Sequence, residues 1–276
     1  MTPNTRRAYD ALLLTFLITV VIRRALLGGT VSLAGPVVLS QGAMVLGLTW
    51  LHACARSGFR RALQLFFLTI TLSLGAEWLG ASRGWIFGSY DYGTLLGLRI
   101  GGEVPILIPL AWYVLAYLAD ALACLSLPSG SSSWFRVIYA ALTLTAWDFL
   151  FDPICVSLGA WTWDGGGAYF GHIPLTNFAG WYAVSLVIFA LYTLGGRRRE
   201  EQQRAETFAR SDPFRFGAPI PLYFGITALM VVFALRLDLI AEALLGAAAA
   251  LPIVLMGVQG YVEKLRQLQR DAATTK

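Results

Sequence analysis

Charged residues are clumped along this chain and leave long uncharged stretches between them. Such stretches cover residues 25–55, 62–76, 104–119, 165–196, 216–235 and 243–262. A helix needs about 20 predominantly apolar residues to cross a bilayer. The pattern therefore predicts eight membrane-spanning helices, over residues 8–27, 34–54, 62–80, 104–127, 135–158, 175–195, 217–235 and 239–260.

The first of these spans is the least regular, because Arg23 and Arg24 leave an uncharged run of only 12 residues, 11–22. We expect both arginines to extend their charged groups toward the membrane surface. No small-residue cleavage site closes this first apolar run, so a cleaved signal peptide is not expected.

The composition agrees with a membrane environment. Hydrophobic residues make up 57% of the 276 positions and charged residues only 13%, and the mean hydropathy is +0.64. Soluble domains carry roughly 25% charged residues. We predict an all-α, polytopic integral membrane protein with a single transmembrane domain over residues 1–276.

The net charge of +5 is explained by the distribution of basic residues rather than by nucleic-acid binding. If both termini are cytoplasmic, 16 of the 21 basic residues lie on the inner side, and five lie outside: Arg23, Arg24, Arg83, Arg99 and Arg236. This asymmetry predicts cytoplasmic termini in a multi-pass protein of the cell membrane. Residues 196–216 then form a charged, partly helical cytoplasmic loop.

The two loops expected outside, 81–103 and 159–174, are rich in glycine and aromatic residues. Seven of the nine tryptophans lie in these loops or in the helices next to them: Trp78, Trp85, Trp112, Trp147, Trp161, Trp163 and Trp181. A belt of interfacial aromatics would be spread along the whole chain. The concentration of tryptophans indicates that the central third of the chain has a specialised role.

The two halves of this centre resemble each other. "VPILIPLAW" (104–112) parallels "IPLTNFAGW" (173–181), and "EWLGASRGWIF" (77–87) parallels "DPICVSLGAWTW" (152–163). We interpret this as a parallel internal repeat, spans three and four matching spans five and six. Chance similarity between two aromatic, glycine-rich loops is the alternative. In the repeat, Glu77 and Asp152 are equivalent.

Asp148 and Asp152 stand four residues apart in the apolar run "AWDFLFDPICV". Each carboxylate near the middle of a membrane helix costs about 2.5–3.5 kcal/mol on insertion scales. The spacing places both on one helix face, and Pro153 removes a backbone donor there. One interpretation is a proton-sharing acid beside a cavity. The other is an interhelical hydrogen-bond clamp with Asn177, a tyrosine or the backbone.

Other polar residues map to the same outer side, which favours a site over a clamp for the whole group. As supporting residues we consider Arg83, Asp91, Glu103, Asp164 and His172. Each has a simpler role available: Asp91 and Asp164 as turn formers, Arg83 and Glu103 as an ion pair, and His172 as a loop brace. Asp120, toward the inner end of span four, is expected to be structural. His52, near the inner end of span two, has no evident partner.

The sequence lacks HExxH, DDxxD, P-loop and GxSxG motifs. With only two histidines, a histidine-built metal site is not expected. We therefore predict no metal and no cofactor.

Three segments together resemble the carotenoid biosynthesis membrane proteins of the CruF type, which are carotenoid hydratases of bacteria and haloarchaea. They are "AEWLGASRGWIFGSYDYGTLLG", "EVPILIPLAWYVLAYLA" and "AWDFLFDPICVSLGAWTWDGGGAYFGHIPLTNFAGWYAVS", within residues 76–185. The resemblance implies addition of water across the terminal C1–C2 double bond of an acyclic ψ end group. It also implies a carotenoid substrate, which is lycopene-like, γ-carotene-like or a C50 precursor, together with contacts to membrane lipid and to other enzymes of the carotenoid pathway.

That chemistry matches the residues already collected. We predict Asp148, Asp152 and Glu77 as catalytic carboxyls that protonate the alkene. Aromatic faces stabilise a cation, and we predict that nine residues bind the substrate: Trp78, Trp85, Tyr90, Tyr92, Trp147, Trp161, Trp163, Asn177 and Trp181. A carotenoid end-group cyclase would use the same acid and cation. A proton-coupled transporter would also use intramembrane acids, although no ladder of acids leads to the cytoplasmic side.

Overall fold

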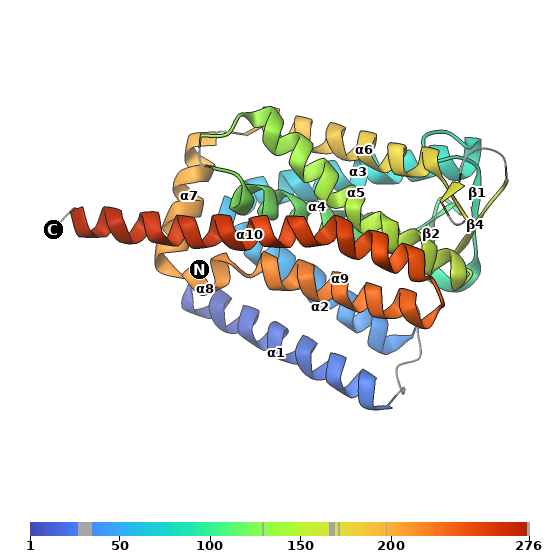
Figure 1. Ribbon diagram of the computed structural model, residues 1–276, viewed down its shortest axis with the longest axis horizontal. Helices are drawn as coiled ribbons and strands as arrows, with labels where there is room; N and C mark the ends of the chain where they lie inside the picture. Colours follow the sequence, from blue (N-terminus) through green and yellow to red (C-terminus); the bar gives the residue numbers. More distant parts are fainter. Residues whose placement is uncertain (27–34, 129, 166–168, 171, 197, 275–276) are drawn as a thin grey trace.

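The computed structural model describes residues 1–26, 35–128, 130–165, 169–170, 172–196 and 198–274. The long helices of these residues form a bundle along one common direction, with α7 lying across one end and short strands at the other (Figure 1). The helices are α1 (Pro3–Leu26), α2 (Pro36–Ser57), α3 (Phe59–Arg83), α4 (Leu107–Ser126), α5 (Ser133–Ser157), α6 (Leu175–Leu194), α7 (Arg198–Ser211), α8 (Pro213–Phe216), α9 (Pro219–Arg236) and α10 (Ile240–Thr274).

Seven helices in the described part of the chain are long and apolar enough to cross a membrane: α2 to α6, α9 and α10. They coincide with the last seven predicted spans. The first predicted span is also a helix, α1. Every window of 18 residues in α1 holds at least three charged residues, so α1 is not among the seven.

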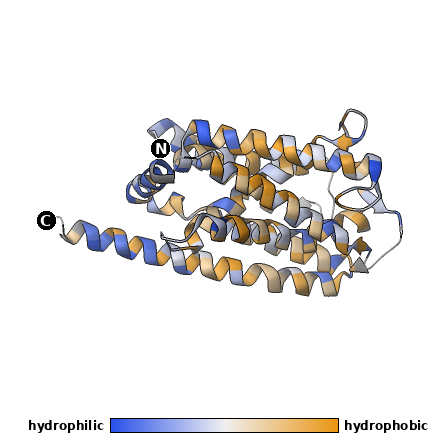
Figure 2. Cartoon of the chain, turned by 90° about the horizontal axis from the view of Figure 1, so that it is seen from above, coloured by the Kyte–Doolittle hydropathy of each residue, from blue (hydrophilic) through white to orange (hydrophobic). Residues whose placement is uncertain are grey.

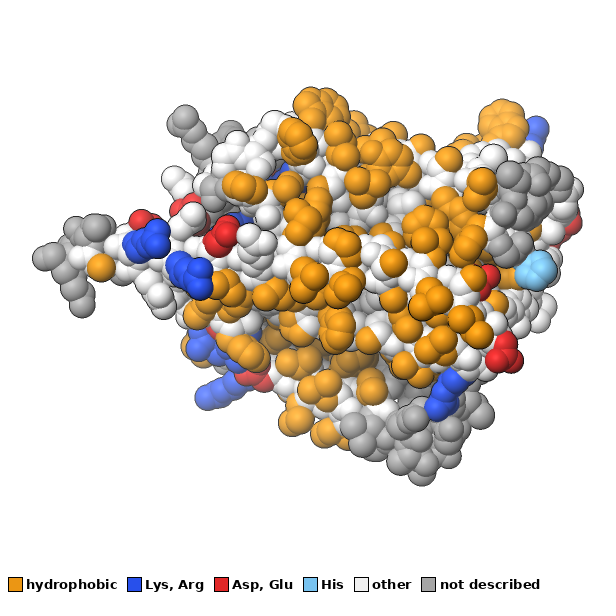
Figure 3. Space-filling view, viewed as in Figure 1, with side chains coloured by type: hydrophobic (Ala, Val, Ile, Leu, Met, Phe, Trp, Pro, Cys, Tyr) orange, Lys and Arg blue, Asp and Glu red, His pale blue; other side chains and the backbone are white. Residues whose placement is uncertain are grey.

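The surface has the distribution expected of a membrane protein. Hydrophobic side chains cover the middle of the face seen in Figure 3, and charged side chains gather toward its two ends. Figure 2 shows hydrophobic residues along the bundle helices and hydrophilic residues in the C-terminal part of α10. The prediction of an all-α, multi-pass membrane protein is confirmed.

The two ends of the bundle differ. One end, here called the terminal end, carries both chain termini, α7 and α8 (Figure 1). The opposite end, here called the loop end, carries the strands β1 (Tyr90–Tyr92), β2 (Arg99–Ile100), β3 (Val104–Pro105), β4 (Trp161–Trp163), β5 (Tyr169–Phe170) and β6 (Ile173–Pro174), and the short 3-10 helix η1 (Thr94–Leu96). The described residues of the charged segment 196–216 are largely helical, as α7 and α8, and lie at the end opposite the two aromatic loops.

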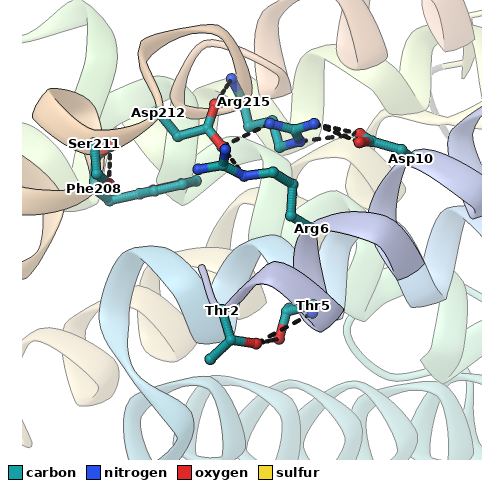
Figure 4. A network of polar contacts seen from close by, with 8 residues as sticks. All are labelled: Thr2, Thr5, Arg6, Asp10, Phe208, Ser211, Asp212 and Arg215. Atoms are coloured by element: carbon teal, nitrogen blue, oxygen red, sulfur yellow. Dashed lines mark hydrogen bonds and ion pairs between the residues drawn. The ribbon is translucent and has the colours of Figure 1, made fainter.

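Ion pairs hold α1 to α8 at the terminal end (Figure 4). The Arg215 guanidinium donates to both carboxylate oxygens of Asp10, at 2.5 and 2.7 Å, and also to Asp212 at 2.7 Å. Arg6 lies 3.3 Å from Asp212. These contacts place the N-terminal helix on the bundle although its apolar run is short.

A second polar group at the terminal end involves two residues discussed above. Asp120 accepts hydrogen bonds from Arg56 and, at 2.8 Å, from Arg136, so its predicted structural role is confirmed. His52 does have partners, contrary to expectation: the Tyr117 hydroxyl at Nδ1, and the Arg215 carbonyl at 2.8 Å from Nε2. Both partners are distant in sequence, which is why the apolar pattern around His52 gave no sign of them.

Helices α4 and α5 are the centre of the bundle. In each, 72% of the most apolar window is buried, against 44% or less in the other five spans. Helix α4 packs against α3, α5 and α10, and α5 also packs against α6 and α9. Any polar side chain on the inner face of α5 must therefore find its partners inside the protein.

Small residues allow α10 to lie close to the two central helices. A Cβ atom at Gly260 would overlap the carbonyl oxygen of Leu125 in α4, and one at Gly246 would overlap the side chain of Leu150 in α5. Such contacts are typical of helix pairs in membranes, where small residues permit close packing of backbones.

We predict that Gly260→Ala lowers the unfolding temperature of the purified protein, because the new methyl group would meet a backbone carbonyl that has no room to move. Gly225→Ala is the matched control. Gly225 lies in α9, and no atom lies within 4 Å of the place that a methyl group would take there, so alanine gains about 1 kcal/mol of helix propensity. Thermal unfolding in detergent measures both. Equal stability of the two variants would contradict this packing.

The orientation of the bundle is open to a direct test. We predict that a cysteine at position 103, exposed at the loop end, reacts with a membrane-impermeant maleimide in intact spheroplasts, because the distribution of basic residues predicts that this end faces outward. A cysteine at position 266, exposed near the terminal end, should react only after permeabilisation. The unsubstituted chain, with its three cysteines, gives the background. The reverse pattern would place the loop end in the cytoplasm.

Candidate active site

Asp148 and Asp152 lie on one face of α5 near the loop end, fully enclosed by protein. Asn177 of α6 binds both: its amide nitrogen donates to Asp148 Oδ2 at 2.9 Å and to Asp152 Oδ2. The three side chains are 2% exposed or less. One amide donor thus holds two acidic groups within hydrogen-bond reach of the same nitrogen atom.

Glu77 near the end of α3 is surrounded by hydrogen-bond donors. The Tyr90 and Tyr92 hydroxyls donate to Oε2 at 2.5 and 2.7 Å, and the Trp112 indole N–H donates to Oε1 at 2.9 Å. Burial, and next the Glu77 carboxylate, raise the pKa of both tyrosine hydroxyls above the usual value. A raised pKa keeps a phenol protonated to higher pH, so both tyrosines remain donors to Glu77.

The strand pair β1–β4 places the aromatic side chains of both loops over these carboxyl groups. Its register is antiparallel, with Tyr90 opposite Trp163 and Tyr92 opposite Trp161. Ring centroids lie 4.7 Å apart in the first pair and 5.8 Å in the second. Because successive side chains of a strand point to opposite faces, Asp91 between the tyrosines is exposed.

Local backbone geometry brings the first loop back over the helices. Gly84 closes α3 in the left-handed conformation, at φ 67°, and its N–H donates to the Gly80 carbonyl. Ile86 follows at φ 70°, a conformation that is costly for a β-branched residue. The turn delivers Phe87 to a buried position beneath the loop.

A small cavity of about 20 Å³ lies among these groups. A buried water molecule needs roughly 10–15 Å³ by this kind of measure, so the cavity has the size of about one water. Two carboxyl groups, Glu77 and Asp152, line it. Asp148 does not, and it is linked to Asp152 by the Asn177 amide that donates to both. The other lining residues are Phe87, Tyr90, Tyr92, Ile108, Ala111, Trp112, Phe151, Trp161, Trp163, Asn177 and Trp181.

The internal repeat has a counterpart in the structure. Each half has the order helix, strand, two-stranded hairpin and helix, as α3–β1–β2–β3–α4 and α5–β4–β5–β6–α6. The equivalent strands β1 and β4 pair with each other, and the equivalent residues Trp112 and Trp181 stack at 4.0 Å with their ring planes 13° apart. Glu77 and Asp152, also equivalent, face the same cavity. The cavity thus lies between the two repeats.

The structure divides the sequence-predicted residues into two groups. Those at the cavity or bonded to its lining are Glu77, Tyr90, Tyr92, Asp148, Asp152, Trp161, Trp163, Asn177 and Trp181. Trp147 is buried beside them and stacks on Phe151 at 4.9 Å without lining the cavity.

The second group is exposed and away from the cavity. Trp78 and Trp85 are 47% and 61% exposed, and Arg83, Asp91, Glu103, Asp164 and His172 also lie at the surface. Asp164 accepts a hydrogen bond from the Ser89 hydroxyl at 3.4 Å, which suits a loop role. Within the described residues, no ion pair joins Arg83 to Glu103.

Sequence reasoning missed several lining residues, above all Trp112 and Phe87. Trp112 could have been found, because the repeat makes it the equivalent of Trp181. Phe87, Phe151, Ile108 and Ala111 carry no pattern that separates them from ordinary apolar residues. Among the described residues, no group of three histidine, cysteine, aspartate or glutamate side chains is placed to hold a metal ion.

Fold and site together define a polytopic helical membrane protein that encloses an aromatic, carboxyl-lined chamber between two structural repeats. The model of one protein family, described as carotenoid biosynthesis protein, matches residues 34–254. This chain belongs to that family, as the resemblance in the sequence indicated. The match runs from α2 into the first half of α10 and includes every residue of the chamber.

A characterised relative is similar over part of this region. The chain is 31% identical over 146 residues to bisanhydrobacterioruberin hydratase of Haloarcula japonica. The matched part is 52% of this chain and 49% of the relative, so the chain spans about half the length of the curated relative it matches. No solved structure matches the chain.

Proposed function

We propose that this protein is a carotenoid hydratase that adds water across the terminal C1–C2 double bond of an acyclic ψ end group. Family membership and the relative's name support a hydration reaction on a carotenoid. The observation that carries the proposal is the arrangement of Asp152 and Glu77 on one cavity, within a lining of aromatic rings.

The Asp148–Asp152 pair is the proposed proton donor. Two carboxyl groups that share a buried site and one amide donor cannot both be charged without a large electrostatic cost, so one proton is shared between them. Asp152 faces the cavity and delivers this proton to C2 of the alkene. Asp148 and Asn177 are positioning residues: Asp148 does not line the cavity, and the Asn177 amide, at the cavity wall, donates to both aspartates and so orients Asp152.

Glu77 has a different environment and a different proposed role. Three donors point at its carboxylate oxygens, and hydrogen bonds to the charged form favour it. Protonation at C2 leaves a tertiary cation at C1. The negative charge of Glu77 and the faces of the surrounding tryptophan and tyrosine rings stabilise that cation.

Water capture completes the reaction. The oxygen of one water molecule forms the new bond to C1, and the proton it loses passes to Glu77. Glu77 and Asp152 line the same cavity, so the proton returns to the aspartate pair. The sum is one alkene and one water giving one tertiary alcohol, with no oxidant, reductant, cofactor or metal in the scheme.

The cavity admits about one water molecule and is too small for a branched isoprenoid end, so aromatic side chains must move when substrate enters. The rest of a carotenoid would lie along the bundle among membrane lipids. A lycopene-like, γ-carotene-like or C50 substrate, a plasma-membrane location and association with other carotenoid-pathway enzymes are part of this proposal.

Expression in a lycopene-producing bacterium tests the reaction. We predict a new pigment heavier than its precursor by one water molecule, with a tertiary hydroxyl at C1, identified by mass spectrometry and nuclear magnetic resonance. A cyclic end group of unchanged mass would instead indicate a cyclase. Unchanged pigments with acyclic, monocyclic and C50 precursors alike, together with proton or solute flux in proteoliposomes, would indicate a transporter.

We predict that Asp152→Asn lowers the hydration rate by about 10²–10⁴-fold, the usual contribution of a positioned acid. Asparagine keeps the volume and hydrogen bonding of the aspartate but cannot donate the proton. Asp148→Asn should lower the rate less, because Asp148 acts through Asp152. Glu77→Gln should also lower it, through loss of the negative charge.

Asp91→Asn is the matched control, since Asp91 lies on β1 between two cavity tyrosines and is exposed. It should keep wild-type activity. Membrane insertion and thermal unfolding of each variant separate catalysis from folding. If Asp152→Asn is folded and keeps most of its activity, the aspartate pair is a hydrogen-bond clamp and the proposed acid is wrong.

A further inference from the structure

A second and larger cavity, of about 210 Å³, lies at the terminal end, far from the carboxyl chamber. Residues from the C-terminal ends of α2 and α4, the start of α5, and the helices α7 and α10 surround it. None of its lining residues belongs to the proposed active site. The catalytic proposal gives this cavity no role.

The deepest charged group beside this cavity contains two arginines and one carboxylate. Arg56 and Arg136 both line the cavity, and both donate to Asp120. Asp120 is 3% exposed and Arg56 is 4% exposed. The buried Nε of Arg56 has no hydrogen-bond partner in the described structure. One carboxylate therefore balances two guanidinium groups, and a buried donor is left free.

Lys264 of α10 adds a third positive charge to the cavity wall. Its ammonium donates to the backbone carbonyl of Cys124, which is a neutral acceptor. Among the described residues, no carboxylate lies within ion-pair distance of Lys264. Together with the arginine group, this leaves an excess of two positive charges.

The acidic residues at the rim reduce this excess to one positive charge but do not remove it, because two of the three pair with another arginine. Glu201 pairs with Arg61, which lies outside the cavity. Asp271 pairs with Arg210 at 3.3 Å. Glu206 accepts a hydrogen bond from the neutral amide of Gln202 at 3.0 Å, so its own charge offsets one positive charge of the cavity, screened by its exposure to solvent.

We propose that this cavity binds a phosphate group, held by Arg56, Arg136 and Lys264. Uncompensated buried charge is costly, and an anion with several acceptor oxygens would neutralise it. Guanidinium groups match the geometry of phosphate oxygens, and an ammonium adds a point charge. The phosphate comes from a phospholipid headgroup at the membrane surface or from a free phosphate of the aqueous phase. The proposal is independent of the hydratase reaction.

The test uses the full-length protein, purified and delipidated in a neutral detergent. Its unfolding temperature is measured with inorganic phosphate against chloride at equal ionic strength, and with dioctanoyl phosphatidylglycerol against dioctanoylglycerol. We predict that a phosphate-bearing probe raises the unfolding temperature in a saturable way. Stabilisation by inorganic phosphate identifies a free anion as sufficient, and stabilisation by the phospholipid alone identifies a lipid headgroup. If neither probe stabilises the protein, the proposal is wrong.

Lys264→Gln should weaken the apparent affinity for the stabilising probe by about tenfold or more, the value of one hydrogen bond to a charged group. Arg266→Gln is its control: Arg266 is two residues away on the same helix, exposed and outside the cavity lining. Equal affinity in the two variants would place the phosphate elsewhere.

A second pair of variants tests phosphate binding at this cavity if Lys264→Gln fails to fold. Gln267→Glu puts a negative charge on the cavity wall and leaves Arg56, Arg136 and Lys264 unchanged. Gln269→Glu puts the same charge on α10 at an exposed position outside the cavity lining. We predict that only the first weakens binding of the probe. Equal binding by both would overturn the proposal.

Discussion

The structure of this protein depends on the burial of three carboxyl groups, Glu77, Asp148 and Asp152, inside a bundle that water does not reach freely. Each buried carboxyl costs free energy unless hydrogen bonds or a proton compensate it. The compensation comes from Asn177, Tyr90, Tyr92 and Trp112, which lie on α6, β1 and α4. Satisfying the acids therefore fixes the relative positions of α3 to α6 and holds the loop of residues 84–106 over them.

The duplicated architecture explains how one chain gathers these groups. Two copies of the same helix–strand–hairpin–helix unit meet through equivalent elements, β1 with β4 and Trp112 with Trp181. The equivalent acidic residues of the two copies, Glu77 and Asp152, have different surroundings. Glu77 is surrounded by donors, whereas Asp152 shares one amide with a second aspartate. These different surroundings are the basis of the proposed division of roles, in which Glu77 holds charge and Asp152 holds a proton.

At the terminal end of the bundle, buried charge also requires compensation, but there the charge is positive. Arg56, Arg136 and Lys264 converge there on the single carboxylate of Asp120 and on a backbone carbonyl. At the loop end, buried negative charge is met by neutral donors and by a shared proton. Arginine cannot release its proton at any accessible pH, so excess positive charge requires an anion. This difference separates the proposed chamber for proton chemistry from the proposed phosphate cavity.

The sequence by itself determined the membrane class, the spans and the location of the unusual residues. Long uncharged runs leave few structures other than spanning helices, because a bilayer requires every backbone polar group to be bonded within the segment. The four-residue spacing of Asp148 and Asp152 and the repeat around Trp181 are local patterns, so they too could be read directly.

Only the tertiary structure decided which residues of the aromatic loops face inward. The pairing of β1 with β4 turns Tyr90, Tyr92, Trp161 and Trp163 toward the chamber, whereas Trp85 lies outside both strands and is exposed. The register of this pairing is set by contacts between segments some 70 residues apart, and no local pattern encodes such contacts. The partners of His52 and the converging cations around Asp120 lay beyond the sequence for the same reason.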